Sequence, residues 1–272
     1  MTTTKLFYKY MPFDPNGSLR VITDGTIKFS NPLEFNDPFD CNPVVDGKSY
    51  EEEIKNSTAL QKALCKKMGI SHEDWRANEN ILLSRLKEGF QAGQHNKLTQ
   101  ERLGVCCLTT KATNPLMWAH YADSHRGFVV EFQVPTTFES YEKVNDSYFD
   151  IRLLAATEVI YVNQRPTLHA ADPTDVRVNK GFYIKSEHWR YEEEYRVLSR
   201  DLGPGIHKFH RNRILSSVIA GCKMGEIELE QLKDAIKNVN QQEGTSIEFF
   251  HAVLSEHLFE LSIPGHPIWD IQ

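Results

Sequence analysis

The sequence predicts an α+β fold: a single mixed domain over residues 1–272, with a central, mainly antiparallel sheet and a helical insert at about residues 51–102. Three observations lead to this prediction. Short apolar or alternating runs bounded by Gly, Pro, Asn and Asp recur on both sides of the insert, as strands do. Within the insert, residues such as Leu60, Leu64 and Met68 have the spacing of amphipathic helices. No internal repeat or low-complexity tract is present, so one domain is the simplest architecture.

The individual elements follow from turn residues and periodicity. Strands are expected at residues 5–10, 26–30, 104–109, 127–132, 158–162, 189–196, 206–209, 214–221, 246–253 and 259–263. Helices are expected at residues 18–23, two or three times within 51–102, and at 116–122, 173–185 and 226–240. The turn at residues 203–205 makes residues 206–209 the expected hairpin partner of residues 195–198.

Composition limits the class of protein. The net charge of -6 argues against strong nonspecific attraction to a polyanion. The five cysteines have no C-x-x-C spacing and resemble the reduced thiols of a cytosolic protein. No segment resembles a signal peptide, and no run of about 18 apolar residues is present to span a bilayer. A cytoplasmic protein without a membrane partner is therefore expected.

The stretch Trp189–Arg196 is the expected centre of the functional site. An extended backbone would place Glu192, Glu194 and Arg196 on one face of a strand. Two carboxylates about 7 Å apart repel each other unless a cation or a ligand lies between them, and Arg196 is positioned to be that cation. The alternative is a solvated charged strand in which the arginine neutralises its neighbours.

Aromatic side chains accompany this stretch in two other segments. Tyr8 and Tyr10 lie in the first expected strand, and Trp118 and Tyr121 lie in a short expected helix. Such rings can form the floor of a site for a flat cation, or they can pack in the core.

A third polar segment surrounds Pro38. Asn36, Asp37 and Asp40 there predict either a turn capped by side-chain to backbone hydrogen bonds or a binding loop.

A metal site is an alternative reading of residues 120–125. His120 and His125 are five residues apart, one more than the spacing that places two imidazoles on one helical face. If the helix ends near Asp123, the three side chains can converge on a metal ion. No Gly-rich phosphate loop, Gly-x-Ser-x-Gly elbow or His-Glu-x-x-His sequence is present.

Together these motifs resemble a bacterial family called domain of unknown function 2971. The resemblance rests on four segments: Tyr8-Lys9-Tyr10, residues 29–40, Met117–Phe128 and Trp189–Arg196. It covers most of the chain, and the family has no established activity.

In outline, the chain is also similar to enzymes of the ADP-ribosyltransferase superfamily. These have an early strand whose His, Arg or Tyr touches the dinucleotide, a later strand with Ser or Tyr, and a Glu near the end of the catalytic core. This resemblance implies NAD as a substrate, with Glu194, Glu192 and Ser30 as catalytic residues. The residues expected to bind NAD are Tyr8, Lys9, Tyr10, Asn36, Asp37, Trp118, His120, Tyr121 and Arg196.

The leading functional expectation is an NAD-dependent ADP-ribosyltransferase-like enzyme, a bacterial toxin or anti-phage effector acting on a protein or nucleic-acid acceptor. A carboxylate that grips the ribose would stabilise the oxocarbenium-like state formed when nicotinamide leaves. One alternative is a metal-dependent hydrolase or nuclease using His120, Asp123 and His125. The other is a non-catalytic binding module.

Overall fold

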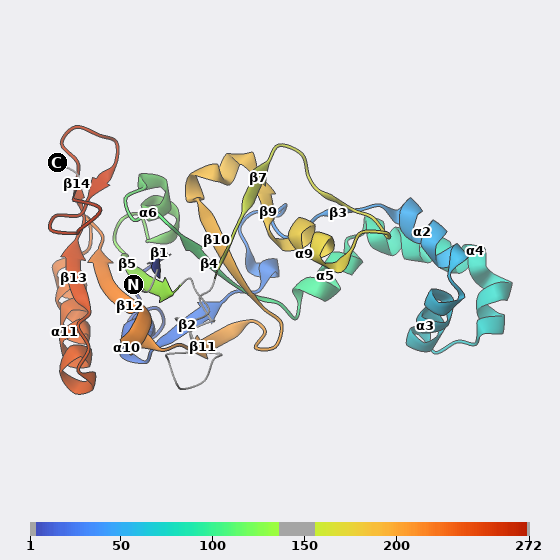
Figure 1. Ribbon diagram of the computed structural model, residues 1–272, viewed down its shortest axis with the longest axis horizontal. Helices are drawn as coiled ribbons and strands as arrows, with labels where there is room; N and C mark the ends of the chain where they lie inside the picture. The colour runs from blue at the N-terminus through green and yellow to red at the C-terminus, as the bar shows by residue number, and fades with distance from the viewer. Residues whose placement is uncertain (1–3, 136–155, 271–272) are drawn as a thin grey trace. The chain divides into compact units, whose positions relative to one another are not determined.

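The computed structural model describes residues 4–135 and 156–270, and the chain divides into two compact units (Figure 1). The first unit comprises Met1–Ser30, Gly104–Val159 and His188–Gln272. The second comprises Asn31–Leu103 and Ile160–Glu187. The second unit thus contains the whole predicted insert of residues 51–102. It begins earlier, however, and takes in a second stretch of chain.

A seven-stranded sheet forms the centre of the first unit, in the order β13-β12-β5-β1-β4-β10-β6. Every neighbouring pair is antiparallel except β12 and β13. The predicted α+β class with a mainly antiparallel sheet is therefore confirmed. The strands are β1 (Thr4–Met11), β4 (Gly104–Thr109), β5 (Phe128–Pro135), β6 (Thr157–Glu158), β10 (Glu194–Ser199), β12 (Leu215–Ala220) and β13 (Glu248–His251).

The parallel pair is joined by helix α11 (Glu226–Glu243), which lies alongside β13 in Figure 1. Its buried residues, Leu232, Ala235, Ile236 and Val239, recur at three- and four-residue spacing and join the core. Gly244 ends the helix in the left-handed conformation, which glycine adopts without a steric penalty.

Alternation along the strands gives the sheet two different faces. One face carries a large apolar core, to which α1 (Arg20–Thr23), α10 (Arg211–Ile214) and α11 contribute. The opposite face carries a smaller and more polar core. Helix α6 (Pro115–Tyr121) and residues 261–269 near the end of the chain pack on it. Below, we call this second surface the polar face.

Two small ribbons complete the first unit. β2 (Thr26–Phe29) pairs with β11 (Gly205–Lys208), and β14 (Val253–Leu254) pairs with β15 (Leu261–Ser262). The predicted hairpin between residues 206–209 and 195–198 is therefore wrong. β4 pairs with β10 along one edge and β6 pairs with Tyr195 and Arg196 on the other, while β11 pairs with β2 instead.

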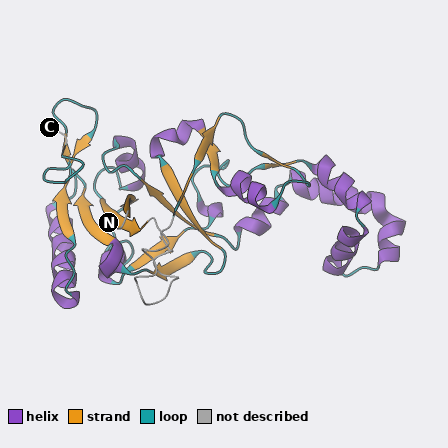
Figure 2. Cartoon of the chain, viewed as in Figure 1, coloured by secondary structure: helices purple, strands orange, loops and turns teal. Residues whose placement is uncertain are grey.

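Helices dominate the second unit, together with two short parallel ribbons (Figure 2). The helices are α2 (Gly47–Asn56), α3 (Thr58–Met68), α4 (His72–Gln91), α5 (Gln94–Gln100) and α9 (Thr174–Phe182), with the 3-10 turn η1 (Pro32–Glu34). The ribbons pair β3 (Val44–Val45) with β8 (Thr167–Leu168), and β7 (Ile160–Val162) with β9 (Ile184–Ser186).

The predicted insert contains four helices rather than two or three, and three of them begin at a polar cap. Asp46 caps α2, Ser57 caps α3, and Ser71 forms a reciprocal capping box with Asp74 at the start of α4. Each break leaves amide groups that the helix cannot satisfy itself, and these side chains accept from them. Pairing of β3 with β8 and a buried ion pair between Lys185 and Asp40 explain why residues 160–187 belong to this unit.

Within the described ranges, no helix combines the length and the apolar character that crossing a membrane requires.

A substitution at Gly127, between α6 and β5, tests how closely the turn before β5 is packed. A Cβ atom there would lie 2.1 Å from the Met11 carbonyl oxygen and 3.0 Å from the Ala122 carbonyl group. Gly127→Ala is therefore expected to lower the free energy of unfolding by about 1–3 kcal/mol in urea denaturation. Gly181→Ala is the control, because no atom lies within 4 Å of its added methyl group. Equal stability of the two variants would contradict the packing described here.

Candidate functional site

The stretch Trp189–Arg196 is a strand only in its second half. A 3-10 turn, η2 (Glu187–Glu192), precedes Glu193, whose φ of 43° is left-handed, and β10 begins at Glu194. The prediction of a strand from residue 189 is therefore wrong. The turn is held from outside, since the Asn114 side-chain amide donates to the Tyr191 carbonyl oxygen at 2.7 Å. The alternation of side chains in the sequence could not predict this contact, because Asn114 and Tyr191 are 77 residues apart.

The left-handed residue decides which carboxylates are buried. Glu192 and Glu194 are each 3% exposed. The Glu193 side chain is 42% exposed and pairs with Lys111 at 3.1 Å. Both carboxylates named by the sequence thus point inward, and the solvated-strand alternative is wrong for them.

Glu194 and Arg196 form a fork-shaped ion pair within β10. Arg196 donates from Nε to Oε1 of Glu194 at 2.7 Å and from Nη2 to Oε2 at 2.9 Å. The two side chains are 4% and 0% exposed. Residues two apart on a strand share a face, as expected, and Arg196 is the predicted cation. A bidentate pair uses one lone pair on each carboxylate oxygen and fixes the planes of both groups.

Glu192 has a different environment, at the end of helix α6. Its Oε1 accepts from the Tyr121 hydroxyl at 2.6 Å. Asn114 places this helix against η2, because its Oδ1 caps the Leu116 amide while its Nδ2 donates to Tyr191. Pro115 at the first position also favours a helix start here.

Tyr121 belongs to a group of four neighbouring rings, with His120, Trp189 and Tyr191, which we call the aromatic cluster. The His120 centroid lies 6.2 Å from that of Tyr121 and 6.3 Å from that of Tyr191. Trp189 lies 6.0 Å from Tyr191. His120 is exposed and the other three are half-buried. Rings at these separations attract each other and present a partly open aromatic surface.

A third buried carboxylate, Glu131 of β5, is the centre of a network that the sequence reasoning missed. It accepts from the Tyr8 hydroxyl at 2.8 Å, the Ser216 hydroxyl at 2.5 Å and His266 Nε2 at 2.9 Å. Trp269 Nε1 donates to the Tyr8 hydroxyl at 2.7 Å. One signal was available, because Glu131 is a single acidic residue inside the apolar run of residues 128–134.

The tautomer of His266 follows from its other contacts. Its Nδ1 accepts from the backbone amides of Ile268 and Trp269 at 3.2 and 3.3 Å. In the neutral ring the proton is therefore on Nε2, which donates it to Glu131.

Strand register places the carboxylates of Glu131 and Glu194 in one row on the polar face. Glu131 pairs with Tyr8, Tyr8 with Thr109, and Thr109 with Glu194, so the row crosses β5, β1, β4 and β10. Burial raises the pKa of Glu131, but hydrogen bonds from His266, Ser216 and Tyr8 outweigh it and leave the pKa below its usual value. Burial and the nearby Glu131 charge raise the pKa of Tyr8, which keeps this donor protonated.

Three of the predicted NAD-binding aromatics are core residues. Tyr8, Tyr10 and Trp118 are 1%, 7% and 0% exposed. The Tyr10 hydroxyl donates to the Lys111 carbonyl at 2.9 Å, and Trp118 Nε1 donates to the Ala112 carbonyl at 2.7 Å. The core-packing alternative describes them. Lys9 also contacts backbone, with its Nζ 3.0 Å from the Cys107 carbonyl oxygen.

Ser30 is not brought to the glutamates. It pairs with Val105 near the start of β4, whereas Glu194 pairs with Thr109 at the other end of this strand. The two positions are four residue steps apart along β4, or roughly 13 Å.

Asn36 and Asp37 belong to the second unit, where Asp37 forms a capped turn. Its Oδ1 accepts from the Phe39 amide at 2.9 Å, which is the turn alternative of the prediction.

The residues proposed for a metal site have other partners. Asp123 pairs with Arg126 at 3.0 Å, and the His125 ring stacks on Trp118 with an 8° angle between planes. Burial lowers the pKa of His125. In the part of the chain that the structure describes, no three His, Cys, Asp or Glu side chains form a group that could hold a metal ion.

Fold and site together define an α+β protein whose sheet buries two bonded carboxylates on one face. Residues 117–197 match the family described as protein of unknown function (DUF2971). This match confirms the resemblance predicted from the motifs, and it spans α6, β5 and the Glu194–Arg196 pair. Comparisons with curated proteins and with solved structures gave no match.

Removing the guanidinium of Arg196 tests the buried ion pair. Arg196→Met is expected to lower the free energy of unfolding by about 3–5 kcal/mol, because Glu194 would stay buried without its main cation. Arg196→Lys keeps the charge but loses the fork, so an intermediate value is expected. Urea denaturation followed by tryptophan fluorescence measures both. A Met variant as stable as the wild-type protein would show that the pair has no structural role.

Glu131→Gln tests the network through its pH dependence. The variant is expected to be less stable by about 1–3 kcal/mol at neutral pH. Because the folded-state pKa is lowered, the contribution of ionised Glu131 is complete above its ordinary pKa of 4.5 and is lost as the pH falls through the lower folded value. The stability difference between the two proteins should therefore shrink below that pH. If the urea midpoints of wild type and Glu131→Gln differed equally at all pH values, ionised Glu131 would not be the source of the stability difference.

Proposed function

We propose that the first unit is an enzyme that breaks the bond between nicotinamide and ribose in NAD and transfers ADP-ribose to a macromolecular acceptor. The observation that carries the proposal is the buried carboxylate of Glu192, bonded to Tyr121 beside a partly open aromatic cluster. Both the residue type and the surroundings fit a reaction that develops positive charge on a sugar.

The reaction needs a carboxylate at the ribose and a base for the nucleophile. As the bond between C1 of the ribose and the nicotinamide nitrogen breaks, its electron pair goes to nicotinamide, which leaves as a neutral molecule. Glu192 accepts a hydrogen bond from a ribose hydroxyl and stabilises the positive charge left on the sugar. An acceptor hydroxyl, amine or water then bonds to C1 and gives up a proton to the surrounding water, which serves as the base. In this proposal the ribose hydroxyl replaces the Tyr121 hydroxyl at Glu192.

The aromatic cluster supplies binding for the nicotinamide ring. That ring is flat and positively charged, and the face of a Tyr or Trp attracts a cation by about 0.5–2 kcal/mol. Tyr191 and Trp189 are half-buried, which leaves part of each ring in contact with solvent. The fully buried Trp118 and Tyr8 are therefore assigned to the core rather than to the ligand.

Glu194 is assigned a positioning role, and this separates the two glutamates. Both of its oxygens accept from Arg196, and removing a buried guanidinium is costly. The Tyr121 hydroxyl, which donates to Oε1 of Glu192, is a neutral donor that a ligand hydroxyl can replace with little loss. The ion pair fixes the start of β10 immediately after Glu192 and Glu193.

A non-catalytic binding module is the second candidate. Glu131 and Glu194 bond to other side chains of the protein, and buried ion pairs and networks of this kind also occur for structural reasons alone. This observation favours a binding module. In that case the aromatic cluster would bind a partner without any bond being broken.

Incubation with NAD and measurement of free nicotinamide separate the two candidates. Wild-type protein is expected to release nicotinamide, and Glu192→Gln to lower the rate by at least about 100-fold while the protein stays folded. Glu193→Gln is the matched control, because this neighbour is half-exposed and paired with Lys111. Release without added acceptor would indicate water as the nucleophile.

Two results would overturn the enzymatic proposal. One is wild-type protein that releases no nicotinamide with protein, DNA or RNA acceptors present. The other is Glu192→Gln as active as wild type. If the protein is a toxin or anti-phage effector, expression of the wild type should slow the growth of a bacterial host, and expression of Glu192→Gln should not.

A further inference from the structure

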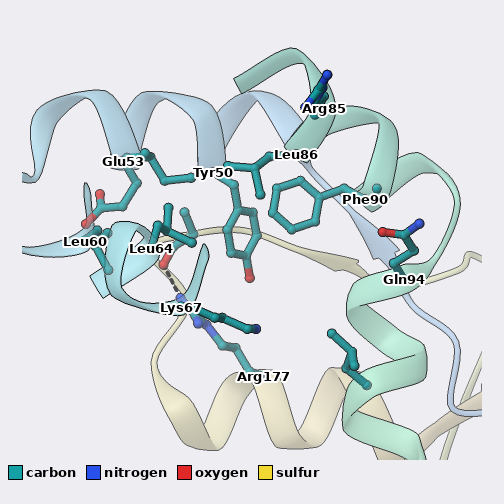
Figure 3. Close-up of a pocket in the computed structure, with 14 residues that line it drawn as sticks. Tyr50, Glu53, Leu60, Leu64, Lys67, Arg85, Leu86, Phe90, Gln94 and Arg177 are labelled. Atoms are coloured by element: carbon teal, nitrogen blue, oxygen red, sulfur yellow. Dashed lines mark hydrogen bonds between the residues drawn. The ribbon is translucent and has the colours of Figure 1, made fainter. Parts of the chain in front are cut away.

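A cavity of about 450 Å³ lies within the second unit, and none of the residues assigned above to NAD binding or catalysis lines it. Helices α2, α3, α4 and α5 line it together with residues of the segment 170–177 (Figure 3). Its volume falls in the range of sites for small molecules, about 300–1,000 Å³.

The walls of the cavity are mainly apolar. Ile54 of α2 and Leu64 of α3 contribute aliphatic side chains, as does Leu86 of α4. Tyr50 and Phe90 add two rings whose centroids are 5.1 Å apart, and Figure 3 shows these rings next to each other in the middle of the site. Such walls favour a ligand with an aliphatic or aromatic body.

The charges around the cavity are mostly positive. Lys67, Arg85 and Arg177 line it, against one carboxylate, Glu53. Figure 3 draws Lys67 and Arg177 at the hydroxyl end of Tyr50. The lining therefore carries an excess of positive charge although the whole chain is acidic, with a net charge of -6.

These cations are not neutralised by direct contact with carboxylates. Within residues 4–135 and 156–270, no Asp or Glu forms an ion pair with Lys67 or Arg85. Arg177 donates to the backbone carbonyls of Ala170 and Asp172, which are neutral acceptors, and its guanidinium lies 5.7 Å from the Tyr50 ring. Arg177 thus holds one wall in place while its charge remains available to a ligand.

From this combination we propose that the second unit binds a small carboxylate with an aliphatic or aromatic body, in the cavity between α2, α3, α4 and the 170–177 segment. The apolar body occupies the space beside Tyr50, Phe90 and Leu64. The carboxylate faces the cations at the rim. A polyphosphate fits this site poorly, because most of its surface would lie against apolar walls.

Decanoate and decanol are suitable probes, because they share a chain and differ in charge. Isothermal titration calorimetry with the full chain is expected to detect decanoate binding to the wild type. Lys67→Gln/Arg85→Gln should weaken decanoate about tenfold, since two rim charges each contribute roughly threefold, and should change decanol affinity by less than about twofold. Lys62→Gln/Arg76→Gln is the matched control. It removes the same residue types from the same two helices, outside the cavity lining.

A second variant locates the binding. Leu64→Trp fills part of the cavity and should weaken both decanoate and decanol. Three results would overturn the proposal: no decanoate binding by wild type, equal loss in the control and rim variants, or unchanged binding after Leu64→Trp. Because all three read out binding in the second unit, they are independent of nicotinamide release.

Discussion

Glu131 and Glu194 place two negative charges in one row on the polar face of the sheet. The residues that pack on this face supply the hydrogen bonds and the cation that these buried carboxylates require. A buried carboxylate is tolerated only when hydrogen bonds or a cation replace its lost hydration. Glu131 is satisfied by a hydroxyl of β1, a hydroxyl of β12 and an imidazole near the end of the chain. Glu194 is satisfied from its own strand by Arg196. The polar face is therefore held by directional bonds in addition to apolar contact.

The left-handed backbone of Glu193 determines where the Glu192 carboxylate lies. Were residues 189–196 one continuous strand, Glu192 would lie beyond Glu194 on the same face of the sheet. The left-handed Glu193 and the turn before it instead bring Glu192 to the end of α6, where its Oε1 accepts from the Tyr121 hydroxyl. A positive φ at a non-glycine residue costs of order 1–3 kcal/mol and persists where surrounding contacts fix it. The Asn114 contact to Tyr191 is one of these.

Local patterns in the sequence were sufficient for much of the fold. Alternation predicted that Glu194 and Arg196 would share a face, and helical spacing predicted a helical insert at about residues 51–102, where the structure has α2, α3, α4 and α5. The failures involve contacts that no local pattern records. β11 pairs with β2, far from it in sequence, instead of with nearby β10. Likewise, His266 and Glu131 are 135 residues apart, so neither residue indicates the other.

For the candidate site, too, local sequence patterns indicated residues but not the contacts between residues that are far apart in the sequence. Residue type and parity pointed to Glu192 and Glu194, whereas Tyr121 and His120 were named as binding residues through the family resemblance. Neither showed that Arg196 would bind Glu194 through both oxygens or that Tyr121 would donate to Glu192, because such contacts depend on how the elements pack. The difference between these two contacts matters for chemistry. A carboxylate that binds an arginine through both oxygens is pre-organised but already occupied, whereas exchanging one hydroxyl donor for another preserves the number of hydrogen bonds. In this protein the pair of Glu194 with Arg196 fixes the start of β10, and the Tyr121 hydroxyl at Glu192 is a donor that a ligand hydroxyl can replace.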